Sequence, residues 1–77
     1  MTHEIPKHVK NRTVEHCIDE YVRLRRDRAI LRDHWFDGVS FMALADKYNL
    51  SLTAVKDVVY DVGDPIILMA VKITETG

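Results

Sequence analysis

The chain has 77 residues, of which 47% are hydrophobic and 30% charged, and its formal net charge at pH 7 is -1. This size and composition indicate one small globular domain and argue against a multidomain protein or a chain disordered across its middle. No apolar run approaches the roughly 20 residues that cross a bilayer, and the first ten residues lack the apolar stretch of a signal peptide, so we expect a cytoplasmic protein without membrane contact.

Residues 1–11 contain a proline and no apolar periodicity, which predicts a flexible N-terminal arm ahead of a domain spanning 12–73. From 13 to 36, apolar residues recur at helical spacing, but their register shifts near Arg25. The pattern fits one long helix whose apolar stripe drifts, or two helices that meet around residues 23–26. We favour one long N-terminal helix, straight or bent, because no Gly or Pro interrupts it.

Gly38 is expected to end this segment, since glycine readily adopts the left-handed conformation that closes many helices. Ser40 and Ser51 each offer a side-chain oxygen that caps a new helix. Asn49 lies between them and is one of the few non-glycine residues that accept a positive φ. The predicted elements are a helix over 41–48, a turn at Asn49 and a second helix over 52–62.

The second helix is expected to stop near Gly63. Asp64 and Pro65 then indicate a further start, with a capping side chain followed by proline at the first helical position. The run IILMAVKI after them is nearly all apolar and predicts a short C-terminal helix over 66–73, with a strand as the alternative because Ile and Val are well represented. Residues 74–77 are expected to form a tail.

Two short helices that cross at a steep angle need apolar or small side chains where their surfaces meet. Ala45 is small enough to let the second helix approach, and Asn49 occupies the turn. The remaining positions of this kind are Leu44, Tyr48, Leu50, Val55 and Val58. The sequence therefore predicts an all-α fold, a small helical domain with a helix-turn-helix, a long N-terminal helix and a short C-terminal helix.

The stretch RDRAILRDHWFDGVSFMALADKYNLSLTAVK, Arg26 to Lys56, carries a further pattern over about two fifths of the chain. Its features are Arg26-Asp27-Arg28, Ile30-Leu31, Phe36, Gly38 with Ser40, Ala45 and Val55-Lys56. In these features it resembles the fourth region of bacterial sigma factors and the related DNA-binding domains of response regulators. The resemblance implies a bacterial or phage transcription regulator that binds double-stranded DNA through the helix-turn-helix.

The chain also departs from that family in two places. It has Ala43-Leu44-Ala45 where family members commonly have Glu-Ile-Ala. It carries Asp57, Asp61 and Asp64 where family members have more basic residues in and after the recognition helix.

In a helix-turn-helix that reads DNA, the second helix lies in the major groove and the outward residues near its N-terminal end reach base edges. Helical spacing gives these residues as Ser51, Leu52, Thr53, Lys56, Asp57 and Tyr60. Lys56 is expected to donate to guanine or phosphate, and Thr53 to contact a base or phosphate. Leu52 would touch a thymine methyl group and Asp57 would accept from cytosine, while Ser40 and the amides that follow it would hold a phosphate. The alternative is that these positions are only solvated.

Cationic side chains gather in the first part of the chain. Residues 1–32 hold eight Lys or Arg against five acidic residues, whereas residues 33–77 hold three Lys against seven acidic residues. Because affinity for nucleic acid comes largely from cations that displace counterions, we expect it mainly from the N-terminal half. Arg25, Arg28 and Arg32 share a helical face that could follow a phosphate backbone. The alternative is a solvated face paired with neighbouring carboxylates.

No pattern of catalytic or metal-binding residues is evident. His3 and His8 have a spacing seen in zinc fingers but lack a Cys-x-x-Cys pair, and Cys17 lies on the apolar stripe, where a thiol is usually buried and inert. A Gly-rich phosphate loop is absent from the sequence. We therefore predict no metal, no cofactor and no enzymatic activity.

The sequence thus predicts a DNA-binding transcription regulator. A homodimer is expected through the long first helix or the apolar C-terminal segment, because Ile66, Ile67, Leu68, Met69 and Val71 exceed what one helix face buries in a small monomer. The alternative function, favoured by the acidic C-terminal half, is an interaction module that docks on RNA polymerase or another regulator without contacting DNA.

Overall fold

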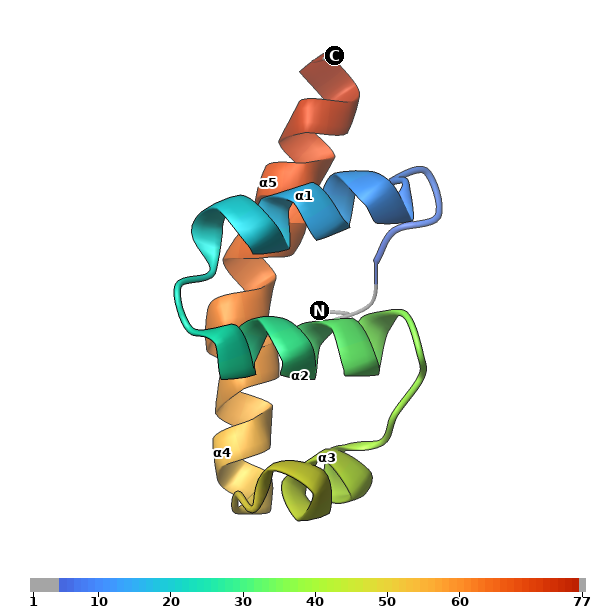
Figure 1. The fold of residues 1–77 in the computed structure, drawn as a ribbon. Coiled ribbons are helices and arrows are strands. Elements are labelled where there is room, and N and C mark those ends of the chain that lie inside the picture. The colour runs from blue at the N-terminus through green and yellow to red at the C-terminus, as the bar shows by residue number, and fades with distance from the viewer. Residues whose placement is uncertain (1–4, 77) are drawn as a thin grey trace.

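The computed structural model describes residues 5–76 of the chain. These residues form an all-α structure, as predicted, and no strand occurs within them. The elements in chain order are α1 (Asn11–Tyr21), α2 (Arg25–Trp35), α3 (Phe41–Tyr48), α4 (Leu52–Asp57), the π-helical segment η1 (Val58–Val62) and α5 (Gly63–Thr76). The last three follow one another without a break and form one column, termed here the C-terminal rod (52–76) (Figure 1). Within residues 5–76, no helix has the length and apolar character needed to span a membrane.

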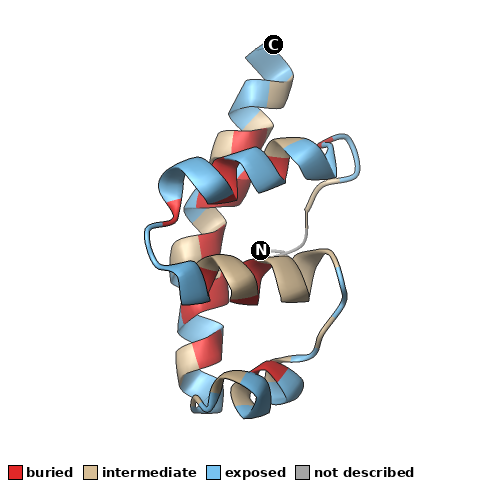
Figure 2. Cartoon of the chain, in the orientation of Figure 1, coloured by how far each residue is buried: buried red, intermediate tan, exposed pale blue. Residues whose placement is uncertain are grey.

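The core lies where the other helices pack on the C-terminal rod. α1 contacts α5, α2 contacts η1, and α3 contacts α4 at one end of the molecule. Figure 2 shows that the buried residues of α1 and α2 lie on the sides of these helices that face the rod. The largest side chains with no exposed surface are Ile18, Ile30, Leu31, Leu44, Val14, Val55, Val59 and Cys17. Burial of these apolar side chains is the main driving force for the fold.

The favoured prediction of one long N-terminal helix is wrong, and its two-helix alternative is correct. α1 ends at Tyr21, and Val22 and Leu24 are extended, with ψ values of 116° and 127°. The shift of register near Arg25 explains the break. In an uninterrupted helix Ile30 would lie about 160° around the axis from Val14, because successive residues are about 100° apart. The break lets both side chains be fully buried.

Both ends of the described chain take part in the fold beyond the predicted bounds of 12–73. Val9 is 5% exposed and belongs to the core, and Ile5 packs against that core. Part of the predicted arm thus packs against the core, while its flexibility stays a prediction, and residues 1–4 lie outside the described part. At the other end α5 continues to Thr76, whose hydroxyl donates to the carbonyl of Lys72 at 2.7 Å. The predicted tail is thus helical over 74–76.

The predicted helix stop at Gly63 is also wrong. Gly63 has helical angles, φ -73° and ψ -40°, and its amide donates to the carbonyls of Tyr60 and Val58. Pro65 lacks an amide hydrogen, and its ring crowds the carbonyl four residues earlier. The π-helical turn of η1 comes just before Pro65. Wider turns of this kind are a known way for a helix to adjust its geometry locally. The predicted short C-terminal helix is therefore the end of the rod, and the strand alternative for 66–73 is excluded.

The predicted helix, turn and helix are present over residues 40–57. Ser40 Oγ accepts a hydrogen bond from the amide of Ala43 at 3.1 Å, and Ser51 Oγ accepts one from Ala54 at 3.1 Å. Asn49 has φ 54° and ψ 48°, the left-handed conformation that ends α3. The three capping roles predicted for these residues are confirmed. As a result, α4 begins at a position set by local hydrogen bonds.

Candidate nucleic-acid interface

The outward face of α4 consists largely of the residues predicted for it. Val55 is fully buried and fixes which side of α4 faces the core. Ser51, Thr53 and Lys56 are exposed, and Leu52 is 41% exposed. Asp57, also a predicted contact, is exposed as well. The structure therefore brings five of the six predicted base-contacting residues together on one free surface. What they contact stays a prediction.

Tyr60 is the exception among these six residues. It is half-buried, and its ring meets the ring of Phe41 edge to face, with 5.9 Å between centroids and 82° between planes. Phe41 in turn packs against the imidazole of His34 at 4.7 Å. His34 Nδ1 lies 2.9 Å from the carbonyl oxygen of Val39, within hydrogen-bond distance. Tyr60 thus joins η1 to α3 and helps to fix the angle between them.

A polar contact fixes the other end of α3. The Lys47 ammonium and the Tyr48 hydroxyl each donate to Asp33 Oδ2 at 2.7 Å, which ties α3 to α2. Lys47 foremost, together with Tyr48, holds the pKa of the Asp33 carboxyl below its ordinary value of 3.8. Lys47 therefore has a carboxylate partner within the chain, so its charge contributes less to the surface around α4.

This contact gives a pH-dependent prediction. We expect Asp33→Asn to destabilise the protein at neutral pH, because the pKa of Asp33 is lower in the folded than in the unfolded chain. The stability due to the ionised carboxylate is complete above the ordinary pKa and is lost as pH falls through the lower folded value. Urea unfolding at successively lower pH should show that the difference in unfolding free energy between variant and wild type shrinks. The control is Asp46→Asn, an exposed aspartate of α3; an equal effect from both variants would contradict this role.

Two of the three arginines predicted to face phosphate are used inside the molecule. Arg28 Nη1 donates to the carbonyls of Val22 at 2.7 Å and Arg23 at 3.1 Å, which lie in the connection between α1 and α2. Arg32 Nη2 donates to Asp19 Oδ1. Arg25 is exposed. Arg28 and Arg32 do share a face, but that face is turned toward α1.

Sequence reasoning missed these internal roles because they depend on the break between α1 and α2. One signal was present: Glu15 and Asp19 lie four residues apart and so share a face of α1. Arg32 Nη2 also lies 3.8 Å from Glu15 Oε1. A paired acidic face on one helix is a reason to expect a cationic neighbour on the next.

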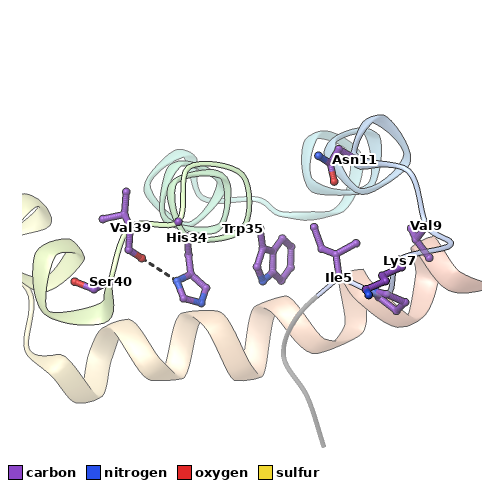
Figure 3. Close-up of a pocket in the computed structure, with 10 residues that line it drawn as sticks. Ile5, Lys7, Val9, Asn11, His34, Trp35, Val39 and Ser40 are labelled. Atoms are coloured by element: carbon purple, nitrogen blue, oxygen red, sulfur yellow. Dashed lines mark hydrogen bonds between the residues drawn. The ribbon is translucent and has the colours of Figure 1, made fainter.

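A cavity of about 520 Å³ opens between residues 5–11 and the connection from α2 to α3 (Figure 3). Trp35 and His34 line it from α2, and Ile5 and Lys7 line it from the N-terminal side. The cavity does not include the outward residues of α4. Within residues 5–76 there is no group of three or more His, Cys, Asp or Glu side chains that could hold a metal ion.

The outward face of α4 is therefore the surface where the predicted contact residues converge. Its position is set by the Ser51 cap, the ring contact of Tyr60 with Phe41 and the Asp33 contact. Comparisons of the chain with protein-family models, with curated proteins and with solved structures found no match.

Proposed function

We propose that the chain binds double-stranded DNA as a transcription regulator, with the N-terminal turns of α4 in the major groove. The observation that carries this proposal is the free face of α4, on which Thr53 and Lys56 point away from the core while Val55 is buried. Hydroxyl and ammonium groups in this position are suited to base edges and phosphates. The turn at Asn49 leaves the start of α4 at the end of the molecule, where a groove can receive it (Figure 1).

The acidic residues of the rod limit which part of it meets DNA. Asp61 is exposed and lies about 13 Å along the rod from Leu52, at 1.5 Å per residue. A duplex that receives only the first turns of α4 avoids this carboxylate. Asp57 lies nearer the start of α4 and is exposed. We propose that its carboxylate accepts a hydrogen bond from the amino group of a cytosine.

Selection from a random duplex pool followed by salt-dependent binding tests this function. We expect wild-type protein to enrich a sequence containing a cytosine contact and to bind less tightly as salt rises. Lys56→Ala should weaken binding and make the slope of log affinity against log salt shallower by about 1. Thr53→Ala should instead relax the preference at one or two base positions.

The matched control for Lys56→Ala is Lys72→Ala. Lys72 is also an exposed lysine of the rod, about 24 Å further along it. The two variants lose the same charge, so a specific role for α4 requires that only Lys56→Ala changes the slope. Equal effects from both variants, or no enrichment from the pool, would contradict the proposal.

The second candidate function is docking on RNA polymerase or another regulator. Two large apolar side chains favour it: Met42 of α3 is 75% exposed and Leu68 of α5 is 64% exposed. In this case the chain would show no DNA affinity for salt to weaken, and Met42→Glu would reduce capture of the polymerase. The same selection experiment therefore separates the two functions.

The homodimer stays a prediction, and the structure changes the reason for expecting it. Ile66 and Ile67 are 3% and 9% exposed, so α1 and the rest of the core already cover part of the apolar C-terminal run. Leu68 remains exposed on the opposite side of α5. Sedimentation of wild type and Leu68→Glu at rising concentration decides whether a second copy covers it, and a monomer at high concentration would rule the dimer out.

A further inference from the structure

A second cationic surface lies where α1 turns into α2. It consists of five exposed residues, termed here the arginine corner: Tyr21, Arg23, Leu24, Arg25 and Arg26. Tyr21 and Leu24 are 56% and 57% exposed. Arg26 contacts Asp27 at 3.3 Å, and within residues 5–76 the side chains of Arg23 and Arg25 have no hydrogen-bond or ion-pair partner. The corner therefore presents charge that the fold does not use.

The backbone of the corner is held in place. The Arg28 guanidinium binds the carbonyls of Val22 and Arg23, and Val22 is only 4% exposed. A surface whose backbone is already ordered loses less conformational entropy on binding than a flexible charged tail does. The buried contact of Val22 also explains why the side chains on either side of it point outward.

The charge of the corner suits phosphate. Residues 20–28 hold four arginines against two acidic residues, and one of these, Asp27, is 7% exposed and is in contact with Arg26. The other is the exposed Glu20 at the end of α1. Arginine forks bind phosphate oxygens in pairs, and a tyrosine hydroxyl can donate to the same backbone. Elsewhere Arg32 and Lys47 have carboxylate partners.

The fold links the corner to α4 through α2 and η1. α2 begins at the corner and packs against η1, the segment that directly follows α4. In Figure 1 both the α1–α2 connection and α4 lie at the left of the view. For one duplex to contact both surfaces, the DNA whose groove receives α4 must also pass the corner.

We infer that the arginine corner binds the phosphate backbone of the same DNA duplex, beside the groove that α4 enters. This inference rests on the proposed function of α4. It keeps the predicted phosphate contact of Arg25, and it replaces those of Arg28 and Arg32, which the fold uses internally, with Arg23 and Arg26. Phosphate contacts supply affinity without sequence information, so the corner adds affinity and α4 supplies specificity.

Three exposed leucines allow a matched test by directed DNA cleavage. Leu24 lies in the corner, Leu52 in α4 and Leu68 on α5. Each is replaced singly by cysteine and labelled with a thiol-reactive iron–EDTA reagent, while the native Cys17 is fully buried and wild-type protein serves as the control. On duplex DNA, Leu52→Cys should cut within the binding site, Leu24→Cys should cut the backbone beside it, and Leu68→Cys should not cut.

The outcomes separate this inference from the function on which it rests. Cutting by Leu52→Cys without cutting by Leu24→Cys would contradict phosphate binding by the arginine corner. It would leave the proposed binding of α4 in the groove intact. No cutting by either would overturn the function itself. As a second measurement, Arg23→Ala with Arg25→Ala should make the salt slope shallower by roughly 2 without changing sequence preference. An unchanged slope, or a changed preference, would contradict the inference.

Discussion

Leu44→Ala is expected to destabilise the protein by about 2–5 kcal/mol, the usual range for removing a buried leucine side chain. Leu44 has no exposed surface and lies in α3, which packs on both α2 and α4. The truncation leaves a cavity at the junction that orients α4. Because a small domain has only about 5–15 kcal/mol of stability, we expect a clear shift of the urea midpoint.

The control for this prediction is Met42→Ala. Met42 lies two residues earlier on the same helix and is 75% exposed, so its truncation should change stability by no more than about 0.5 kcal/mol. Circular dichroism during urea titration measures both variants. If Leu44→Ala were as stable as Met42→Ala, α3 would not be held to the core as the structure shows.

The second large effect is expected at Gly63. A Cβ atom there would lie 2.9 Å from Cζ2 of Trp35 and 3.2 Å from Cδ2 of Leu31. The glycine therefore lets the rod pass close to α2. We expect Gly63→Val to destabilise the protein by about 1–3 kcal/mol through overpacking. The chain's single tryptophan is at the contact, so its fluorescence reports the unfolding directly.

A glycine inside a helix with free space around its Cα would show the opposite sign. Gly63 has helical angles, and a residue with a better helix propensity would stabilise a helix by up to about 1 kcal/mol if space allowed. The decisive measurement is a double-mutant cycle with Gly63→Ala and Trp35→Leu. Gly63→Ala should cost stability in the wild type and cost markedly less with Trp35→Leu. Equal changes in both backgrounds would contradict the close contact.

The features that sequence predicted correctly depend on local interactions. Ser40 and Ser51 cap helices through hydrogen bonds to amides three residues later, and Asn49 ends α3 through its own backbone conformation. Such interactions need no knowledge of the rest of the fold. The outward positions on α4 follow from the burial of Val55, which helical spacing also predicts. The two short helices joined at Asn49 and most of the candidate site were therefore accessible from the sequence.

The features that sequence missed depend on contacts between distant segments. The register shift near Arg25 is compatible with one helix or two, and only packing of α1 and α2 on the C-terminal rod decides between them. The internal roles of Arg28 and Arg32 follow from that decision. Gly63 has the residue type of a helix stop, but its close approach to Trp35 gives it a different role. In each case tertiary packing outweighed a local signal.

Amide chemical shifts of the nitrogen-15-labelled chain, measured as duplex DNA is added at low salt, test the central claim most directly. Low salt favours binding even to a duplex of mixed sequence. We expect the largest changes at the amides of residues 51–56, smaller changes at 23–26, and little change around Leu68. No change with excess duplex, or changes confined to α5, would contradict the claim that α4 is the surface that meets DNA.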